Sequence, residues 1–97
     1  MKQTAEQYWT ARGFTRICTG GNCYAWERTL RADGATPVQI LITAAESEMQ
    51  ATQRMDEGHD VGLYLEGEGE HFDFYIAPDA AAAWAWVRET LAMPEAE

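Results

Sequence analysis

The sequence predicts an α+β domain, in which an antiparallel sheet of about five strands carries an N-terminal and a C-terminal helix on one face. Three observations predict this fold. Residues 60–77 alternate apolar and polar side chains in two runs separated by glutamates and glycines, a pattern typical of a β-hairpin. Apolar stripes with helical spacing occur near both ends of the chain. The runs between them are short and joined by turn residues, which favours antiparallel neighbours.

The length and composition predict one domain. The 97 residues are expected to form a single globular domain, 1–97, and a hydrophobic fraction of 46% suffices for a packed core. No apolar run approaches the roughly 20 residues that span a bilayer, and the N-terminus lacks the apolar segment of a signal peptide. The expected location is therefore the cytoplasm, where the two cysteines are expected to be free thiols.

The charges are unevenly distributed along the chain. Residues 1–45 carry five bases and three acids, which gives a net charge of +2. Residues 46–97 carry two bases and thirteen acids, which gives -11, so the whole chain has a formal charge of -9. Such a field repels nucleic acid and attracts basic partners, although plain solubility is an equally good explanation of the acidity.

The first helix is predicted by its cap. Thr4 and Gln7 have the spacing of a capping box, and Gly13 is placed to end the helix. Tyr8 and Trp9 fall on its apolar stripe and are expected to be core anchors.

Three short strands are expected to follow the first helix, at residues 14–18, 23–30 and 38–43. The sequence does not indicate which face of the second strand is buried. Small Cys23 and Ala25 would suit a position beneath a helix, which would leave Tyr24 and Trp26 on the open face of the sheet.

The hairpin at residues 60–77 is expected to have one buried face. That face is expected to carry Val61, Leu63, Leu65, Phe72, Phe74 and Ile76. The other face is expected to carry Asp60, Tyr64, Glu66, His71, Asp73 and Tyr75. This outer face combines acids with aromatic rings and contains no Lys or Arg.

The remaining segments are a loop and the last helix. Residues 44–59 favour helix by composition but lack an apolar stripe, so we expect a long loop with at most one helical turn. Loops of this length in small domains are often functional. Asp79 is expected to cap a helix that runs to Leu91 or Ala92, with Trp86 lying off its apolar stripe.

Cysteine and histidine are the main candidates for metal or nucleophilic chemistry. Cys18 and Cys23 are separated by four residues, a spacing that a zinc site allows. His59 and His71, however, are twelve residues apart across a hairpin, which matches no zinc pattern. The predicted topology places no base beside Cys23, which argues against a cysteine nucleophile. We therefore expect no catalytic residue, no metal site and no cofactor.

The glutamates between the two hairpin strands predict a charged surface. Glu66, Glu68 and Glu70 occupy every second position, a spacing of about 6.6 Å in extended chain. They are expected to form one ridge with Asp56, Glu57, Asp60 and Asp73. This ridge would present negative charges at regular intervals, as a phosphate backbone does, to a protein that binds nucleic acid through Lys and Arg.

Part of the sequence resembles short uncharacterised proteins of phages and other mobile elements of proteobacteria. The resemblance is carried by the segment TGGNCYAW at residues 19–26, by LIT at 41–43 and by VGLY at 61–64, and those proteins have a further glycine at Asn22. In size, acidity and helix–sheet–helix layout the chain is also similar to anti-CRISPR proteins. This second resemblance implies a host-defence complex as partner and assigns no residue a role.

The sequence therefore predicts a non-enzymatic acidic binding protein of the phage inhibitor type. Its expected partner is a protein with a basic, nucleic-acid-binding surface, such as a CRISPR effector complex, with no direct contact to nucleic acid or membrane. The expected partner-binding residues are Asp60, Tyr64, Glu66, Glu68, Glu70, Asp73, Tyr75 and Trp26. The alternative is a homodimer formed through an exposed aromatic sheet face that contains Tyr24, Trp26, Tyr64 and Tyr75.

Overall fold

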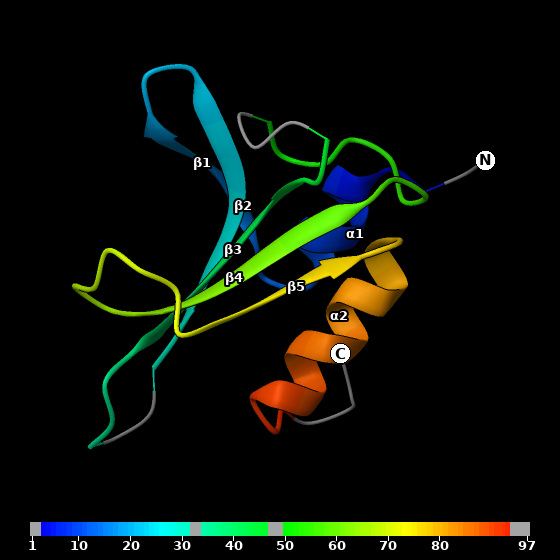
Figure 1. Ribbon diagram of the computed structural model, residues 1–97. Coiled ribbons are helices and arrows are strands. Elements are labelled where there is room, and N and C mark those ends of the chain that lie inside the picture. Colours follow the sequence, from blue (N-terminus) through cyan, green and yellow to red (C-terminus); the bar gives the residue numbers. More distant parts are fainter. Residues whose placement is uncertain (1–2, 32–33, 47–49, 94–97) are drawn as a thin grey trace.

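A computed structural model describes residues 3–31, 34–46 and 50–93, and it confirms the predicted fold class. The elements are α1 (Ala5–Ala11), β1 (Thr15–Gly20), β2 (Cys23–Leu30), β3 (Val38–Ala44), β4 (His59–Leu65), β5 (Asp73–Ala77) and α2 (Ala80–Thr90). The five strands form one sheet in the order β1-β2-β3-β4-β5, and each pairs antiparallel with the next (Figure 1). Edge strands are therefore β1 and β5.

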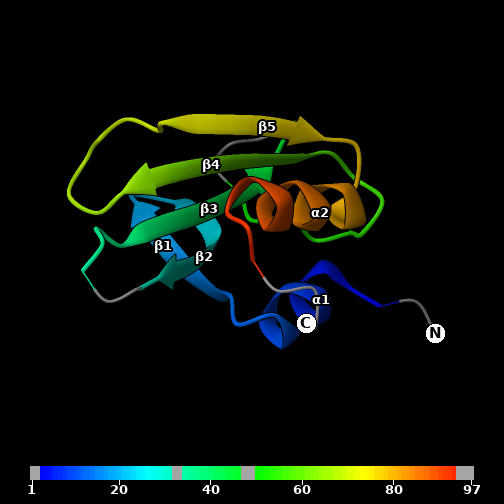
Figure 2. The same cartoon turned by 90° about the horizontal axis from the view of Figure 1, so that it is seen from below.

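Both helices pack against the same side of the sheet, as Figure 2 shows. Their buried side chains meet the inward side chains of β2, β3 and β4 in one core. Its largest fully buried members are Trp9, Phe14, Ile40, Ile42, Leu63, His59, Val61, Val87 and Thr52. The opposite side of the sheet, which we call the open face, is covered by neither helix.

The helix caps are as predicted. The Thr4 hydroxyl accepts a hydrogen bond from the Gln7 amide at 3.1 Å, and the Gln7 side chain accepts one from the Thr4 amide at 2.9 Å. Asp79 caps α2 through the Ala82 amide at 2.8 Å. The apolar stripe of α2 is buried at Ala80, Ala83, Trp84 and Val87 and half-buried at Leu91, and off-stripe Trp86 is half-buried.

The face assignment of β2 differs from the expectation. Trp26 pairs with Ile42 of β3, and directly paired residues of antiparallel strands point to the same side, so Trp26 and Tyr24 lie on the helix side. Trp26 is only 3% exposed, and its indole Nε1 donates to the carbonyl oxygen of Thr52 at 2.9 Å and to its hydroxyl at 3.1 Å. The large ring fills the core, whereas Ala25 faces the open side.

The register of the hairpin also differs from the expectation. Val61 pairs with Tyr75, so Phe74 and Ile76 lie on the open face, opposite Gly62 and Asp60. A shift of one residue moves every side chain of a strand to the other face. Exposed fractions of 51% for Phe72, 55% for Phe74 and 59% for Ile76 show that their predicted burial is wrong.

The contacts that β5 makes on its helix side explain this register. Ala77 is 1% exposed where the chain turns into α2, and its small side chain fits that close approach. The Tyr75 ring stacks on Trp86 with centroids 5.4 Å apart and planes at 24°. The stack gives both rings a contact that sequence periodicity did not indicate.

The segment between β3 and β4 contains no helix or strand within its described residues, 45–46 and 50–58. Hydrogen bonds connect its described residues to β3 and to one another. The Ala44 amide donates to the Gln50 carbonyl at 2.8 Å, and the Glu57 carboxylate accepts from the amides of Gln53 at 2.7 Å and Arg54 at 2.8 Å. The segment thereby brings Thr52 under Trp26.

Candidate binding surface

The open face combines apolar and acidic side chains. Its strand positions are Thr15, Ile17, Thr19, Cys23, Ala25, Glu27, Thr29, Gln39, Leu41, Thr43, Asp60, Gly62, Tyr64, Phe74 and Ile76. None of these positions carries Lys or Arg, whereas Arg16 and Arg28 lie on the helix side, paired with Trp26 and Ile40. The charges are therefore segregated between the two sides of the sheet.

A hollow of about 320 Å³ lies in the open face. It is lined by Thr19, Ala25, Leu41, Thr43, Asp60, Tyr64, His71 and Phe74. All five strands contribute to this lining, which means that the sheet is curled and the open face is concave. Ala25 and Leu41 are its apolar residues from the central strands, and Asp60 is its carboxylate.

Gly62 allows the ring of Tyr64 to lie flat along β4. A Cβ atom at position 62 would lie 2.9 Å from Tyr64 Cε1, closer than Cβ atoms come in real structures, and 3.1 Å from the Tyr64 hydroxyl oxygen, which is an unusually tight contact. The ring therefore leans back over Gly62, in the direction of Asp60. Glycine in a strand interior often marks such a close approach.

A row of aromatic side chains borders the hollow. His71 contacts Tyr64 edge-on with centroids 6.1 Å apart, and it contacts Phe74 with centroids 4.9 Å apart. Phe74 and Ile76 are more than half exposed on edge strand β5. Exposed large apolar side chains that lie together mark an interaction surface more often than isolated ones do.

The acidic loop, residues 66–72, continues this surface beyond the ends of β4 and β5. Glu66 pairs with Arg31 at 3.1 Å, but both side chains are exposed, so the pair contributes only about 0–1 kcal/mol. Glu68 and Glu70 line a shallow depression with Leu65, His71 and Phe72. Carboxylates and apolar side chains are thus interleaved in the loop.

The acids do not form the single ridge that was expected. Asp56 and Glu57 precede β4, while the acidic loop follows it, and seven extended residues separate the two groups by about 20 Å. Asp56 is paired with Arg54 at 3.2 Å, and Glu57 binds backbone amides of its own loop. Asp56 and Glu57 therefore lie at the opposite end of β4 from the acidic loop.

The structure brings together some of the predicted partner-binding residues and separates others. Asp60 and Tyr64 lie on the open face, and Glu66, Glu68 and Glu70 lie in the adjoining acidic loop. Asp73 is exposed at the start of β5, and its carboxylate accepts from the Phe74 amide at 2.9 Å. It pairs with Leu63 and therefore lies on the helix side, so its expected place on one face with Asp60 is wrong.

Two further predicted contacts, Tyr75 and Trp26, are also on the helix side of the sheet. Tyr75 lies on the helix side and stacks on Trp86, and Trp26 is buried beside Thr52. Tyr24 is also on that side, so the expected aromatic face of four rings is wrong and only Tyr64 of that group is on the open face. Phe74 and Ile76 were not expected as surface residues. The sequence signal for this surface is the absence of Lys and Arg between residues 55 and 87.

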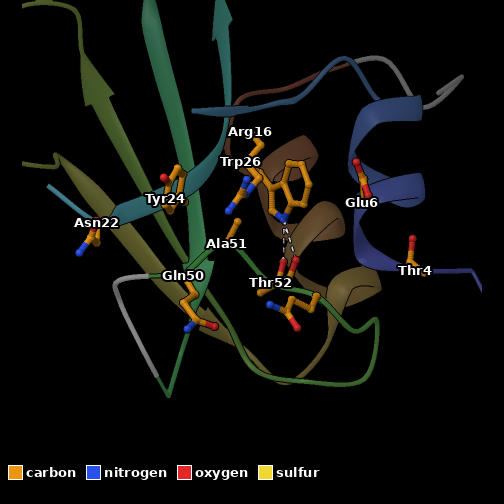
Figure 3. Close-up of a pocket in the computed structure, with 10 residues that line it drawn as sticks. Thr4, Glu6, Arg16, Asn22, Tyr24, Trp26, Gln50, Ala51 and Thr52 are labelled. Carbon is orange, nitrogen blue, oxygen red and sulfur yellow. Dashed lines mark hydrogen bonds between the residues drawn. The ribbon is translucent and has the colours of Figure 1, made fainter. Parts of the chain in front are cut away.

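A second hollow, of about 510 Å³, lies on the helix side between α1, the β1–β2 hairpin and residues 50–53 (Figure 3). The Trp26 indole and its two hydrogen bonds to Thr52 form part of its wall. Arg16 stacks over the Tyr24 ring, with its guanidinium carbon 4.1 Å from the ring centroid. The Asn22, Gln50 and Gln53 amides and the Glu6 carboxylate make this hollow more polar than the one on the open face.

The two cysteines line neither hollow. Within the described residues, no three His, Cys, Asp or Glu side chains lie close enough together to hold a metal ion. Cys18 and Cys23 are free thiols, and the register directs them to opposite sides of the β1–β2 hairpin. His59 lines neither hollow.

His59 is a core residue. It is fully buried, its Nδ1 lies 2.8 Å from the Glu57 carbonyl oxygen, and its ring lies 5.7 Å from the Trp9 ring. Burial lowers the pKa of His59, because the charged imidazolium is poorly solvated there, and the Glu57 carbonyl opposes this only in part. The ring is therefore expected to be neutral at pH 7.

No protein family, curated protein or solved structure matches this chain. The resemblance to phage-borne proteins therefore stays a prediction. In the part of the chain that the structure describes, no helix has the length and apolar character needed to cross a bilayer.

Proposed function

We propose that this chain is a non-enzymatic binding protein that uses the open face and the acidic loop to occupy a basic, nucleic-acid-binding surface of a partner protein. The observation that carries the proposal is the concave open face, which displays Phe74 and Ile76 beside carboxylates and has no Lys or Arg at its strand positions. An apolar centre with a charged rim is the usual composition of a protein–protein interface.

The charge distribution supports a basic partner. Glu68 and Glu70 are exposed and adjoin exposed apolar groups, so a partner that covers Phe72 must also approach these carboxylates. Attraction between exposed charges decays over about 8–10 Å at physiological salt, which covers the width of the loop. Surfaces that bind phosphate backbones through Lys and Arg meet this requirement. The resemblance to anti-CRISPR proteins makes a CRISPR effector complex the first partner to test.

The proposal is tested by reversing the loop charges. In the variant E66K/E68K/E70K each substitution changes the charge by two, so the formal net charge goes from -9 to -3. The matched control E6K/E46K/E89K has the same net charge, but its three exposed sites lie outside the open face and the acidic loop. Each protein is immobilised and incubated with a lysate of the organism that encodes the chain.

We expect wild type and control to retain a basic protein that the loop variant loses. The retained protein should be released by 0.5 M salt and by added duplex DNA or RNA, because screening and competition act on the same charges. Equal retention by the loop variant and the control, with unchanged thermal midpoints, contradicts the proposal.

A homodimer is the second candidate, favoured by β5. This edge strand exposes Phe74 and Ile76 on one side, and antiparallel pairing of two copies about Tyr75 would place Phe74 opposite Ile76 of the partner subunit. Light scattering distinguishes the candidates. A dimer that persists in 0.5 M salt and is lost in Ile76→Lys supports this one, whereas a monomer favours the basic partner.

A further inference from the structure

We infer that the free edge of β5 binds an extended segment of the basic partner, which pairs with β5 as an additional strand of the sheet. This inference rests on the proposed function and specifies which kind of segment is recognised and through which groups. Within the described residues, β5 pairs with β4 along one edge and with no strand along the other. Figure 2 shows β5 at the margin of the sheet.

The hydrogen bonds of β5 indicate which of its backbone groups point outward. The Phe74 amide donates to the Asp73 carboxylate at 2.9 Å, so we assign Phe74 and Gly62 to a pair that is not hydrogen-bonded. Pairs of the two kinds alternate along an antiparallel ladder, which places Ile76 in the same class as Phe74. The amide and carbonyl groups of Phe74 and Ile76 therefore point to the free edge, where they form a template for another strand.

The side chains of β5 leave this edge accessible. Natural proteins protect free edges with lysine, with proline or with a covering element, and residues 72–77 contain neither Lys nor Pro. The Asp73 carboxylate covers the Phe74 amide through an exposed hydrogen bond, which a carbonyl group of an incoming strand can replace. Phe74 and Ile76 are more than half exposed, and an incoming strand would bury part of both.

Charge complementarity indicates that the incoming strand is basic. Asp73 is exposed at the start of β5, and Glu68 and Glu70 precede it in the acidic loop. Opposite charges on directly paired residues stabilise a sheet, and like charges destabilise it. The expected segment therefore carries apolar side chains opposite Phe74 and Ile76, and Lys or Arg opposite Asp73 and next to the acidic loop.

A second copy of this chain matches the edge less well. Antiparallel pairing of two copies about Tyr75 places Asp73 opposite Ala77 of the second copy, which supplies no cation to the carboxylate. Each copy has a formal charge of -9, so the two copies also repel each other. A basic segment of another protein meets both requirements of this edge, the backbone pairing and the charge.

The test uses a defined probe, the blocked peptide acetyl-Thr-Val-Thr-Val-Lys-Lys-amide. When it lies antiparallel to β5, its valines are opposite Ile76 and Phe74, and its lysines are next to Asp73 and the acidic loop. It is titrated into ¹⁵N-labelled full-length protein, and the amide signals and hydrogen exchange of Phe74 and Ile76 are followed. We expect shifts of both signals and slower exchange of both amides, because these amides become donors to the peptide.

Two control peptides separate backbone pairing from charge. Methylation of both valine nitrogens keeps the side chains and the charge but removes the two donors that face β5, and we expect at least about tenfold weaker binding. Replacement of both lysines by glutamate keeps the donors and reverses the charge, and we again expect about tenfold weaker binding.

Variants of the protein test the assigned residues. Ile76→Pro removes one outward amide, a change that edge strands tolerate where the N–H group faces solvent, and we expect at least about tenfold weaker binding. Ile76→Val keeps the amide and should bind the peptide as wild type does. Asp73→Asn keeps an acceptor for the Phe74 amide and should weaken binding about threefold, whereas Glu89→Gln makes the same charge change on α2 and should leave binding unchanged. If Ile76→Pro loses signal dispersion, the methylated peptide decides, because it leaves the protein unaltered.

The outcomes separate this inference from the proposed function. Equal binding of the methylated and unmodified peptides, unchanged β5 signals with the unmodified peptide, or a dimer through β5 that the peptide does not dissociate overturns the strand pairing. If the partner protein is lost from E66K/E68K/E70K but binds folded Ile76→Pro as tightly as wild type, the proposed function stands and this inference fails. If the loop variant retains the partner as the control does, the proposed function fails whatever the peptide does.

Discussion

Gly62→Ala is the substitution that separates the shape of the open face from its charge. The added methyl group would lie 2.9 Å from Tyr64 Cε1, 3.1 Å from its hydroxyl oxygen and 3.3 Å from Cζ. All three atoms belong to the Tyr64 side chain, which is only half-buried, so its ring is able to swing away from the sheet. The net charge of the protein and every carboxylate remain unchanged.

The expected effect on stability is small, because two contributions oppose each other. Replacing glycine by alanine in a strand favours the folded state by about 0.5–1 kcal/mol, because the unfolded chain loses freedom. Moving Tyr64 from its preferred rotamer costs about 0.5–1.5 kcal/mol. The free energy of unfolding should therefore change by less than about 1 kcal/mol, which urea unfolding measures.

The expected effect on binding is large by comparison. With its ring displaced from Gly62, Tyr64 changes the shape of the open face, and we expect the variant to bind the basic partner about tenfold more weakly than wild type does. Gly69→Ala is the control, since a methyl group there meets no atom within 4 Å. Destabilisation by more than about 2 kcal/mol would mean that the Tyr64 ring cannot move away from position 62. Unchanged binding would mean that the position of the ring does not affect binding. Either result contradicts the prediction.

Two further predictions concern the core. Because burial lowers the pKa of His59, the unfolded chain takes up the proton more readily, so the free energy of unfolding should fall as pH falls below about 6.5, the pKa of an unperturbed histidine. This slope should disappear in His59→Gln and persist in His71→Gln, and urea unfolding at several pH values between 5 and 8 measures it. Trp26→Phe removes the donor to Thr52 and should lower the free energy of unfolding by about 1–3 kcal/mol, clearly more than Trp86→Phe at a half-buried ring. Equal losses in the two tryptophan variants would show that the Trp26 hydrogen bonds contribute little.

Features fixed by neighbouring residues were predictable from the sequence. The caps at Thr4 and Asp79 depend on side chains and amides three residues apart, and both formed as expected. The strands were predictable for the same reason, since alternation and turn residues are local signals. Their ends differ from the prediction by only one or two residues.

The choice of face was not predictable for β2 and β5. Each strand carries apolar side chains on both sides, so alternation alone cannot indicate which side meets the helices. The face that meets the helices is set by contacts with residues far away in the sequence: Trp26 donates to Thr52, and Tyr75 stacks on Trp86. This is why Phe74 and Ile76, now part of the candidate surface, were expected in the core.

The most direct measurement of the central claim is displacement of nucleic acid. A fluorescently labelled oligonucleotide is bound to the purified partner, and its anisotropy is followed while this protein is added. We predict that wild type and E6K/E46K/E89K lower the anisotropy to the value of the free oligonucleotide, whereas E66K/E68K/E70K leaves it unchanged. Formation of a complex of all three molecules, with the oligonucleotide still bound, would contradict the account.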